Sequence, residues 1–288
     1  MQCEGEAVQA LHLLAPPPER PARGTVRVLM VGDIIGRPGR TALDAILPGL
    51  REERSIDFVT ANAENAAAGL GLTASTAAAL FSAGVDVLTS GNHVWDKREV
   101  YAELDRDERI LRPLNYAAAG VPGRGWGVFH ARDGTEIAVV NVQGRTYMQP
   151  IDSPFTAMDE LLDSGATELP RVCLVDFHCE LTSEKNALGL YLDGRVSAVC
   201  GTHTHVVTAD ERILRHGTAY ISDIGMTGPI HSVIGFEPGT VLPRFLTGLP
   251  TRFEVGTGPV VFNAVQVDVD VDSGRARHIE RIGRLVDG

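Results

Sequence analysis

The sequence has few cysteines, and they form no motif. Four of its 288 residues are cysteines, no two are spaced as Cys-x-x-Cys, and Cys173, Cys179 and Cys200 lie in or beside apolar stretches. This excludes a Cys-x-x-Cys redox or zinc motif and favours buried free thiols in a reducing compartment. We therefore expect a cytoplasmic protein.

Positive charge and long apolar runs are also scarce. The chain has 26 Lys and Arg against 37 Asp and Glu, a formal net charge of -11. This negative charge argues against sequence-independent binding to nucleic-acid backbones, which normally needs a basic patch. A phosphate substrate would then need cations bound in the site. No apolar run reaches the roughly 20 residues that span a bilayer, so we expect no membrane partner.

The first 24 residues differ from the rest of the chain. The stretch MQCEGEAVQALHLLAPPPERPARG has no basic start, and its apolar patch is too short for a secretory signal. It is either a disordered leader or an over-extended start of translation, and the sequence does not separate the two. The remaining residues, 25–288, have the length and composition of a single domain.

Short apolar strands alternate with amphipathic or Ala-rich helices from Val26 onward. Helices are expected around residues 41–54, 74–83 and 183–192, and the chain after Gly217 is expected to be strand-rich. This alternation predicts a layered α/β fold. Turn sequences at Asp133-Gly134 and Asp272-Ser273-Gly274 predict hairpins, so the sheets are expected to be mixed.

Two histidines follow the strand that ends the stretch VSAVCGTHTH. His203 and His205 are one residue apart, so in an extended segment their rings share a face and can converge on one point. Converging imidazoles suggest a metal ion. An isolated pair could equally be surface or hydrogen-bonded histidines, and the rest of the chain must decide.

Polar side chains with metal-binding capacity follow five predicted strands. In α/β sheets, ligands gather outside the carboxyl ends of the strands, so these loops can meet in one crevice. The candidates, in chain order, are Asp33, Glu64, Asn65, Asn92, His93, His178, His203 and His205.

This mixed set of oxygen and nitrogen donors suits Fe, Mn or Zn better than Mg or Ca alone. Such sets can hold two ions, which in hydrolases lie roughly 3.5 to 4 Å apart and need a bridging carboxylate. Glu64 is the best candidate for the bridge.

The motifs GDIIGRPGR, GNHVWD, DFHCELTSEK, GTHTHVVTAD and GTAYISDIGMTGP have a specific resemblance. Their order resembles the metallophosphoesterase (calcineurin-like) superfamily, with two departures: Ile35 stands where the first motif has histidine, and AEN stands where the second has Gly-Asp. With those departures the chain is similar to the YmdB-type bacterial phosphodiesterase family, from about Val28 to near the C-terminus.

The resemblance implies a four-layer α/β sandwich with mixed β-sheets, the metallophosphoesterase fold. It also implies two transition-metal ions, with Fe favoured over Mn or Zn, and a small phosphodiester substrate such as a cyclic nucleotide. Carried over to this chain, Asp33, Glu64 and His205 would hold one ion. Glu64, Asn92, His178 and His203 would hold the other, and Asn65 is a candidate for the place vacated at Ile35.

The mechanism that this resemblance implies is hydrolysis of a phosphodiester by a metal-bridging hydroxide. His93 is placed to protonate the leaving alkoxide as general acid. Its alternative role is to orient Asn92. The family tends to read Ala-Glu-Ala where this chain has Cys179-Glu180-Leu181, and this departure is interpreted as packing variation.

Two other functions compete with hydrolysis. One is a non-catalytic regulatory protein that binds a nucleotide or RNA on the same fold. Such a protein would be expected to have lost metal ligands, whereas the ligand set of this chain is complete. The other is a di-iron redox protein, which is disfavoured because the chain has no paired Glu-x-x-His motifs. Loops 112–127 and 141–155 are expected to wall the pocket, and a homo-oligomer is left open.

Overall fold

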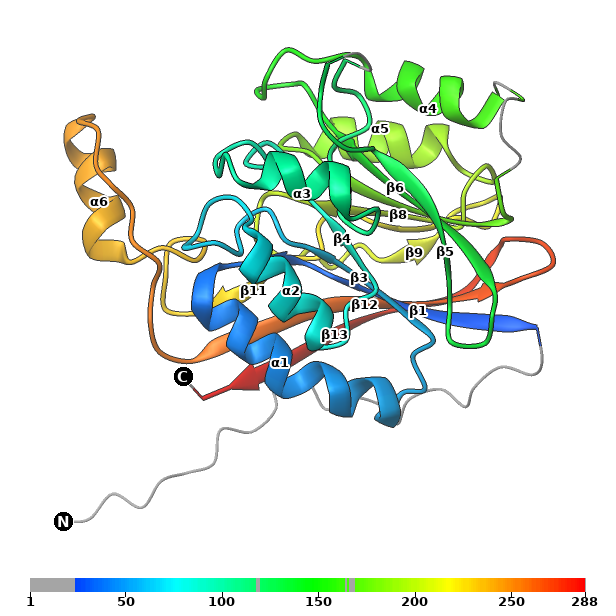
Figure 1. Cartoon of the computed structure of the whole chain (residues 1–288), viewed down its shortest axis with the longest axis horizontal. Coiled ribbons are helices and arrows are strands. Elements are labelled where there is room, and N and C mark those ends of the chain that lie inside the picture. Colours follow the sequence, from blue (N-terminus) through cyan, green and yellow to red (C-terminus); the bar gives the residue numbers. More distant parts are fainter. Residues whose placement is uncertain (1–23, 118–119, 164, 166–168, 288) are drawn as a thin grey trace.

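The computed structural model describes residues 24–117, 120–163, 165 and 169–287, and two β-sheets face each other at its centre (Figure 1). The predicted leader, residues 1–24, lies outside the described residues apart from Gly24. No helix within the described ranges is long and apolar enough to cross a lipid bilayer.

The first sheet has seven strands and is mixed, as expected. Its central strand β1 (Thr25–Val31) pairs in parallel with β3 (Phe58–Asn62) and antiparallel with β12 (Val260–Asp270). The remaining strands of this sheet are β2 (Asp33–Ile34), β4 (Val87–Thr89), β11 (Met226–Pro229) and β13 (Ala276–Val286).

The second sheet has six strands, in the order β5-β6-β7-β8-β10-β9. Strands β6, β7, β8 and β10 are parallel, while β5 and β9 pair antiparallel at the two edges. The strands are β5 (Trp126–His130), β6 (Glu136–Gln143), β7 (Val172–His178), β8 (Ala198–Thr202), β9 (Arg212–Ile213) and β10 (Ala219–Ile221).

Side chains of successive strand residues alternate between two apolar layers. In β1, Val28 and Met30 belong to the core between the sheets, whereas Leu29 and Val31 belong to the core under the helices. That helical layer consists of α1 (Gly36–Glu53), α2 (Ala74–Ser82) and α3 (Val100–Arg106).

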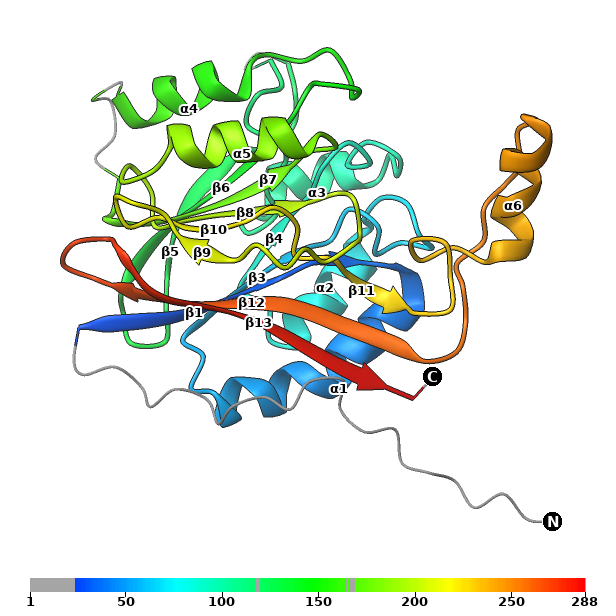
Figure 2. The ribbon, with the colours of Figure 1, turned by 180° about the vertical axis from the view of Figure 1, so that it is seen from behind.

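Helices α4 (Pro154–Asp163) and α5 (Thr182–Tyr191) cover the outer face of the second sheet, where Met158 and Leu188 pack on its strands. The order is therefore helices, sheet, sheet, helices, as Figure 2 also shows from behind. The predicted four-layer α/β sandwich with mixed sheets is confirmed.

Both predicted hairpins are present, because β5 pairs with β6 and β12 with β13. Gly134 and Gly274 take φ values of +88° and +70° in the turns, a conformation that favours glycine. Helix α6 (Pro238–Thr247) was not expected in the chain after Gly217. This helix begins at Pro238 and contains Pro243, and proline in a sequence usually indicates a turn or a helix end.

Candidate metal centre

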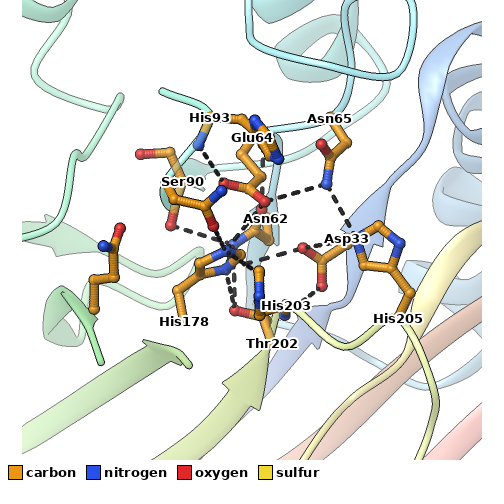
Figure 3. A network of polar contacts seen from close by, with 12 residues as sticks. Asp33, Asn62, Glu64, Asn65, Ser90, His93, His178, Thr202, His203 and His205 are labelled. Atoms are coloured by element: carbon orange, nitrogen blue, oxygen red, sulfur yellow. Dashed lines mark hydrogen bonds and ion pairs between the residues drawn. The ribbon is translucent and has the colours of Figure 1, made fainter. Parts of the chain in front are cut away.

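The candidate residues from the five loops meet at one edge of the two sheets (Figure 3). Asp33 follows β1 and Glu64 follows β3, both in the first sheet. His178 is the last residue of β7 and His203 follows β8, both in the second sheet. Because these strands are parallel within their own sheets, their carboxyl ends deliver side chains to the same edge. The expected convergence of the loops is observed.

Glu64, His178 and His203 form one group, with ligand atoms that all lie within 4.8 Å of one another. His178 Nε2 is 3.1 Å from Glu64 Oε1 and 3.0 Å from His203 Nδ1. Asn92 joins this group through its Oδ1, 3.0 Å from His178 Nε2. Two imidazoles, a carboxylate and an amide oxygen thus converge on one point.

Asp33, Glu64 and His205 form a second group, whose ligand atoms also all lie within 4.8 Å of one another. His205 Nε2 lies 3.7 Å from Asp33 Oδ1, an atom that is buried and has no hydrogen-bond partner within the described residues. A buried carboxylate oxygen without a donor is costly unless a cation satisfies it. Glu64 belongs to both groups.

Asn65 has a different orientation from that of a metal ligand. Its Nδ2 lies 3.1 Å from His205 Nε2 and donates a hydrogen bond of 3.2 Å to Glu64 Oε1. With the side-chain amide in this orientation, Asn65 holds the two candidate ligands Glu64 and His205 in place. Its carbonyl oxygen would face the site only after rotation of the amide.

Hydrogen bonds fix which nitrogen of each histidine is free to bind a cation. His205 Nδ1 donates to the carbonyl oxygen of Ile234 at 2.8 Å, so Nε2 carries the lone pair, which lies 3.1 Å from the Asn65 amide nitrogen at the edge of the site. His203 Nε2 lies 3.0 Å from Glu180 Oε2, which leaves Nδ1 as the free atom. Each ring therefore presents a lone pair to its group.

A buried relay orients His178. Its Nδ1 lies 2.9 Å from Thr202 Oγ1, and that hydroxyl donates to Asp176 Oδ1 at 2.7 Å. Asn62 and Thr89 donate to the other oxygen of Asp176. Because the hydroxyl's own proton goes to Asp176, it accepts the proton of His178 Nδ1, and Nε2 is left free for a ligand bond.

The His203-Thr204-His205 turn has an unusual backbone. His203 and His205 have φ values of +97° and +66°, a region that costs energy for residues other than glycine. Three hydrogen bonds hold it: Asp33 Oδ2 accepts from the His203 amide at 3.1 Å, and Asp223 Oδ2 accepts from the Thr204 amide and hydroxyl at 3.1 and 2.8 Å. Lys185, almost fully buried, pairs with the same Asp223 oxygen at 2.6 Å.

Burial and mutual charge shift the titration of these side chains. Burial alone would lower the pKa of His178, but the negative charges of Glu64 and Asp33 outweigh it and raise that pKa to about 9. Burial lowers the pKa of His203 to about 3, and the positive charge of His178 acts in the same direction. Burial raises the pKa of Asp33 to about 6. His203 is therefore neutral, as a metal ligand must be.

His93 lies at the edge of the cluster. Its backbone amide donates to Glu64 Oε2 at 3.0 Å, and its Nδ1 lies 2.8 Å from Asp96 Oδ2. The ring is one-third exposed and lines the cavity beside the cluster, so Nε2 is the nitrogen available to a bound molecule.

Several side chains that support the cluster were not predicted from the sequence. Glu180 was not among the candidate residues, yet its carboxylate lies 3.0 Å from His203 Nε2. Cys179, part of the departure interpreted as packing variation, is buried. Asp176 could have been found, because it lies two residues before His178 on the same face of β7. Pairing between distant segments, such as Lys185 with Asp223, leaves no such signal.

A cavity of about 480 Å³ opens beside the cluster, and its wall differs from the prediction. The expected wall, loops 112–127 and 141–155, is wrong: their described residues line a separate cavity with Leu114, Tyr116 and Trp126. The residues around the cluster's own cavity are Glu64, Asn65, Leu70, His93, Glu180, His203, Thr204, His205, Ile234, Phe236, Arg244 and Phe253. Part of the wall thus comes from the segment between β11 and β12.

Comparison with protein families gives a match to the model described as YmdB-like protein, over residues 29–282. A relative from Bacillus subtilis (strain 168), named 2',3'-cyclic-nucleotide 2'-phosphodiesterase, is 46% identical over 257 residues, which are 89% of this chain and 96% of the relative. A relative from Mycoplasma pneumoniae, named putative phosphatase/phosphodiesterase, is 36% identical over 91% of this chain and 94% of its own length.

Two solved structures share the fold. A hypothetical protein from Thermus thermophilus superposes with a TM-score of 0.84 at 45% identity and covers 91% of this chain and 99% of its own. A structure described as a novel phosphatase from Mycoplasma pneumoniae has a TM-score of 0.85 at 34% identity and covers 91% and 94%. The resemblance found in the motifs is confirmed over most of the chain.

Proposed function

The chain belongs to the YmdB-like family, and from this premise we propose that it is a phosphodiesterase that hydrolyses cyclic nucleotides with two bound metal ions. It is a hydrolase of phosphoric esters, as the names of its relatives indicate. One observation carries the two-ion proposal: Glu64 belongs to both groups of candidate ligands. A shared carboxylate is what a pair of ions needs as its bridge.

The donor set fits such ions. Asp33, Glu64 and His205 would hold one ion, with the unpartnered Asp33 Oδ1 as a ligand atom. Glu64, His178 and His203 would hold the other, with Asn92 Oδ1 as a fourth ligand. Imidazoles mixed with carboxylates favour Fe, Mn or Zn, and we propose that Fe is the native metal in preference to Mn or Zn. When bound, such ions neutralise charge on phosphoryl oxygens and lower the pKa of water to form a nucleophile.

We propose His93 as the general acid. Asp96 accepts its Nδ1 proton and fixes the ring, and the amide bond to Glu64 fixes the backbone beside the cluster. An imidazolium held in this way can give its Nε2 proton to a leaving alkoxide, a contribution of about 10² to 10⁴ in rate. The alternative role, orienting Asn92, has less support, because no hydrogen bond joins the two side chains in the described structure.

The substrate class follows from the relative in Bacillus subtilis, whose name specifies 2',3'-cyclic nucleotides. We propose that this chain cleaves the same class. We also propose that residues 25–288 act as a single domain, supported by the continuous core between the sheets, in which Val28, Val139 and Val267 all take part. The buried free thiols of Cys173, Cys179 and Cys200 support a cytoplasmic location.

The test is hydrolysis by protein reconstituted separately with Fe(II), Mn(II) and Zn(II). Substrates are 2',3'-cyclic AMP, 3',5'-cyclic AMP, a cyclic dinucleotide and an aryl phosphodiester. We expect turnover of the 2',3'-cyclic nucleotide and loss of it in the Asp33→Ala variant. A fully metallated protein that hydrolyses none of these would instead support the alternative, a nucleotide- or RNA-binding regulator.

A further inference from the structure

An arm leaves the body of the protein between β11 and β12. It comprises residues 234–255, with α6 at its tip, and Figures 1 and 2 both show α6 standing away from the four layers. The two legs of the arm are joined, because the Glu237 amide donates to Glu254 O at 2.8 Å and the Glu254 amide donates to Thr240 Oγ1 at 3.2 Å. The arm therefore has a defined root.

The root is held against the loop that carries Glu64 and Asn65. Gly69 in that loop has φ +92°, and a Cβ at this position would lie 2.8 Å from Val255 Cγ2 and 3.0 Å from Phe236 Cε1. The close approach therefore depends on glycine. On the other side, His205 Nδ1 donates to Ile234 O at 2.8 Å. These contacts fix the root relative to the candidate metal ligands.

The arm turns an aromatic wall toward the cavity beside the cluster. The rings of Phe236 and Phe253 have centroids 5.6 Å apart, and the guanidinium carbon of Arg244 lies 5.6 Å from the Phe253 centroid. All three line the same cavity as His203 and Glu64. Its volume of about 480 Å³ lies within the range of about 300–1,000 Å³ typical of small-molecule sites.

We propose that Phe253, backed by Phe236 and flanked by Arg244, is the subsite that stacks the nucleobase of the substrate. This inference rests on the proposed function, because the phosphate of the same molecule would lie at the cluster. A planar base can stack on Phe253, and a guanidinium at its edge adds a cation–π contact. The side chain of Arg244 lies beside the Phe253 ring and forms no ion pair with any described residue, so it is available to a ligand.

The chemistry of the wall also predicts how selective it is. Of the four cavity-lining residues in the arm, Ile234, Phe236 and Phe253 are apolar, and Arg244 only donates hydrogen bonds. Stacking on an aromatic ring accepts every base, because every base has a π-face. We therefore expect the subsite to require a base without strongly discriminating among bases.

The test compares two cyclic diesters, one with and one without a base. These are 2',3'-cyclic AMP and glycerol 1,2-cyclic phosphate, measured with Mn-loaded enzyme. The Phe253→Leu variant is expected to lower the ratio of their kcat/KM values about 5- to 100-fold, chiefly through KM for the nucleotide, and Phe253→Tyr should restore it. The matched control is Phe245→Leu, since Phe245 lies on α6, is 77% exposed and does not line the cavity.

An unchanged ratio of the two kcat/KM values in Phe253→Leu would overturn the subsite, whether both values fall equally or neither changes. Melting temperature and metal content of each variant separate these results from misfolding. If the unmutated enzyme hydrolyses neither diester, the proposed function fails, and calorimetric binding of 2',3'-cyclic AMP then decides. Equal affinity in the unmutated protein and in Phe253→Leu would overturn the subsite, whereas an affinity weakened about 5-fold or more would support it.

Discussion

Thr202 joins two buried groups, and replacing it tests the relay that orients His178. Thr202→Val keeps the shape of the side chain but removes the hydroxyl, so His178 Nδ1 and Asp176 Oδ1 lose their partners at 2.9 and 2.7 Å. Each buried polar group left without a partner costs about 1–3 kcal/mol. Asp176 keeps Asn62 and Thr89 on its other oxygen, so we expect a total loss of about 2–4 kcal/mol in the free energy of unfolding.

The same change should weaken metal binding. A partner that orients a histidine ligand typically contributes about 10- to 100-fold in metal affinity. The assays are urea unfolding of the metal-free protein and chelator competition for Mn(II).

The matched control for this experiment is Thr227→Val. Thr227 is fully buried in β11, but its hydroxyl has no hydrogen-bond partner within the described residues, so this substitution removes nothing that the fold uses. It should not lower stability. Equal stability and equal metal affinity in the two variants would refute the relay.

Three further predictions concern individual side chains. His93→Asn should retain metal and lose about 10² to 10⁴ in turnover of a substrate with an alkoxide leaving group, but far less with a nitrophenolate, and equal losses would exclude the acid role. Metal affinity should rise with pH up to about 9, because the pKa of His178 in the metal-free site is raised to about 9 and the ring must lose a proton to bind a metal ion. Chelator competition from about pH 6 to about pH 9 measures this affinity, and a flat profile would contradict the prediction. Lys185→Met should cost about 3–5 kcal/mol in urea unfolding, since it leaves Asp223 buried without its cation, and a loss under about 1 kcal/mol would contradict that pairing.

The layered fold and the convergence of the candidate residues could be predicted from sequence because both follow from local patterns. The short apolar run from Val28 to Val31 is typical of a strand that is buried on both faces, and in the structure Val28 and Met30 enter one core while Leu29 and Val31 enter the other. Likewise, a polar residue after each apolar strand marks the carboxyl edge of a parallel sheet, wherever the strands lie in the final order.

The parts that could not be predicted depend on contacts between distant segments. Glu180 supports His203 only because β7 and β8 are adjacent and parallel, a register that no local pattern specifies. The arm was missed because Pro238 and Pro243 suggest turns, although proline is tolerated in the first turn of a helix. The arm can lie against the loop that carries Glu64 because Gly69 in that loop has no side chain, which leaves room for Val255.

The measurement that tests the two-ion centre most directly is metal stoichiometry. Elemental analysis after Mn or Fe reconstitution should give about two ions per chain in the unmutated protein. Because Glu64 belongs to both ligand groups and Asp33 to one, Glu64→Ala should lose both ions together, whereas Asp33→Ala should chiefly lose one. A stoichiometry at or below one ion in the unmutated protein, or a full single ion retained in Glu64→Ala, would contradict the account.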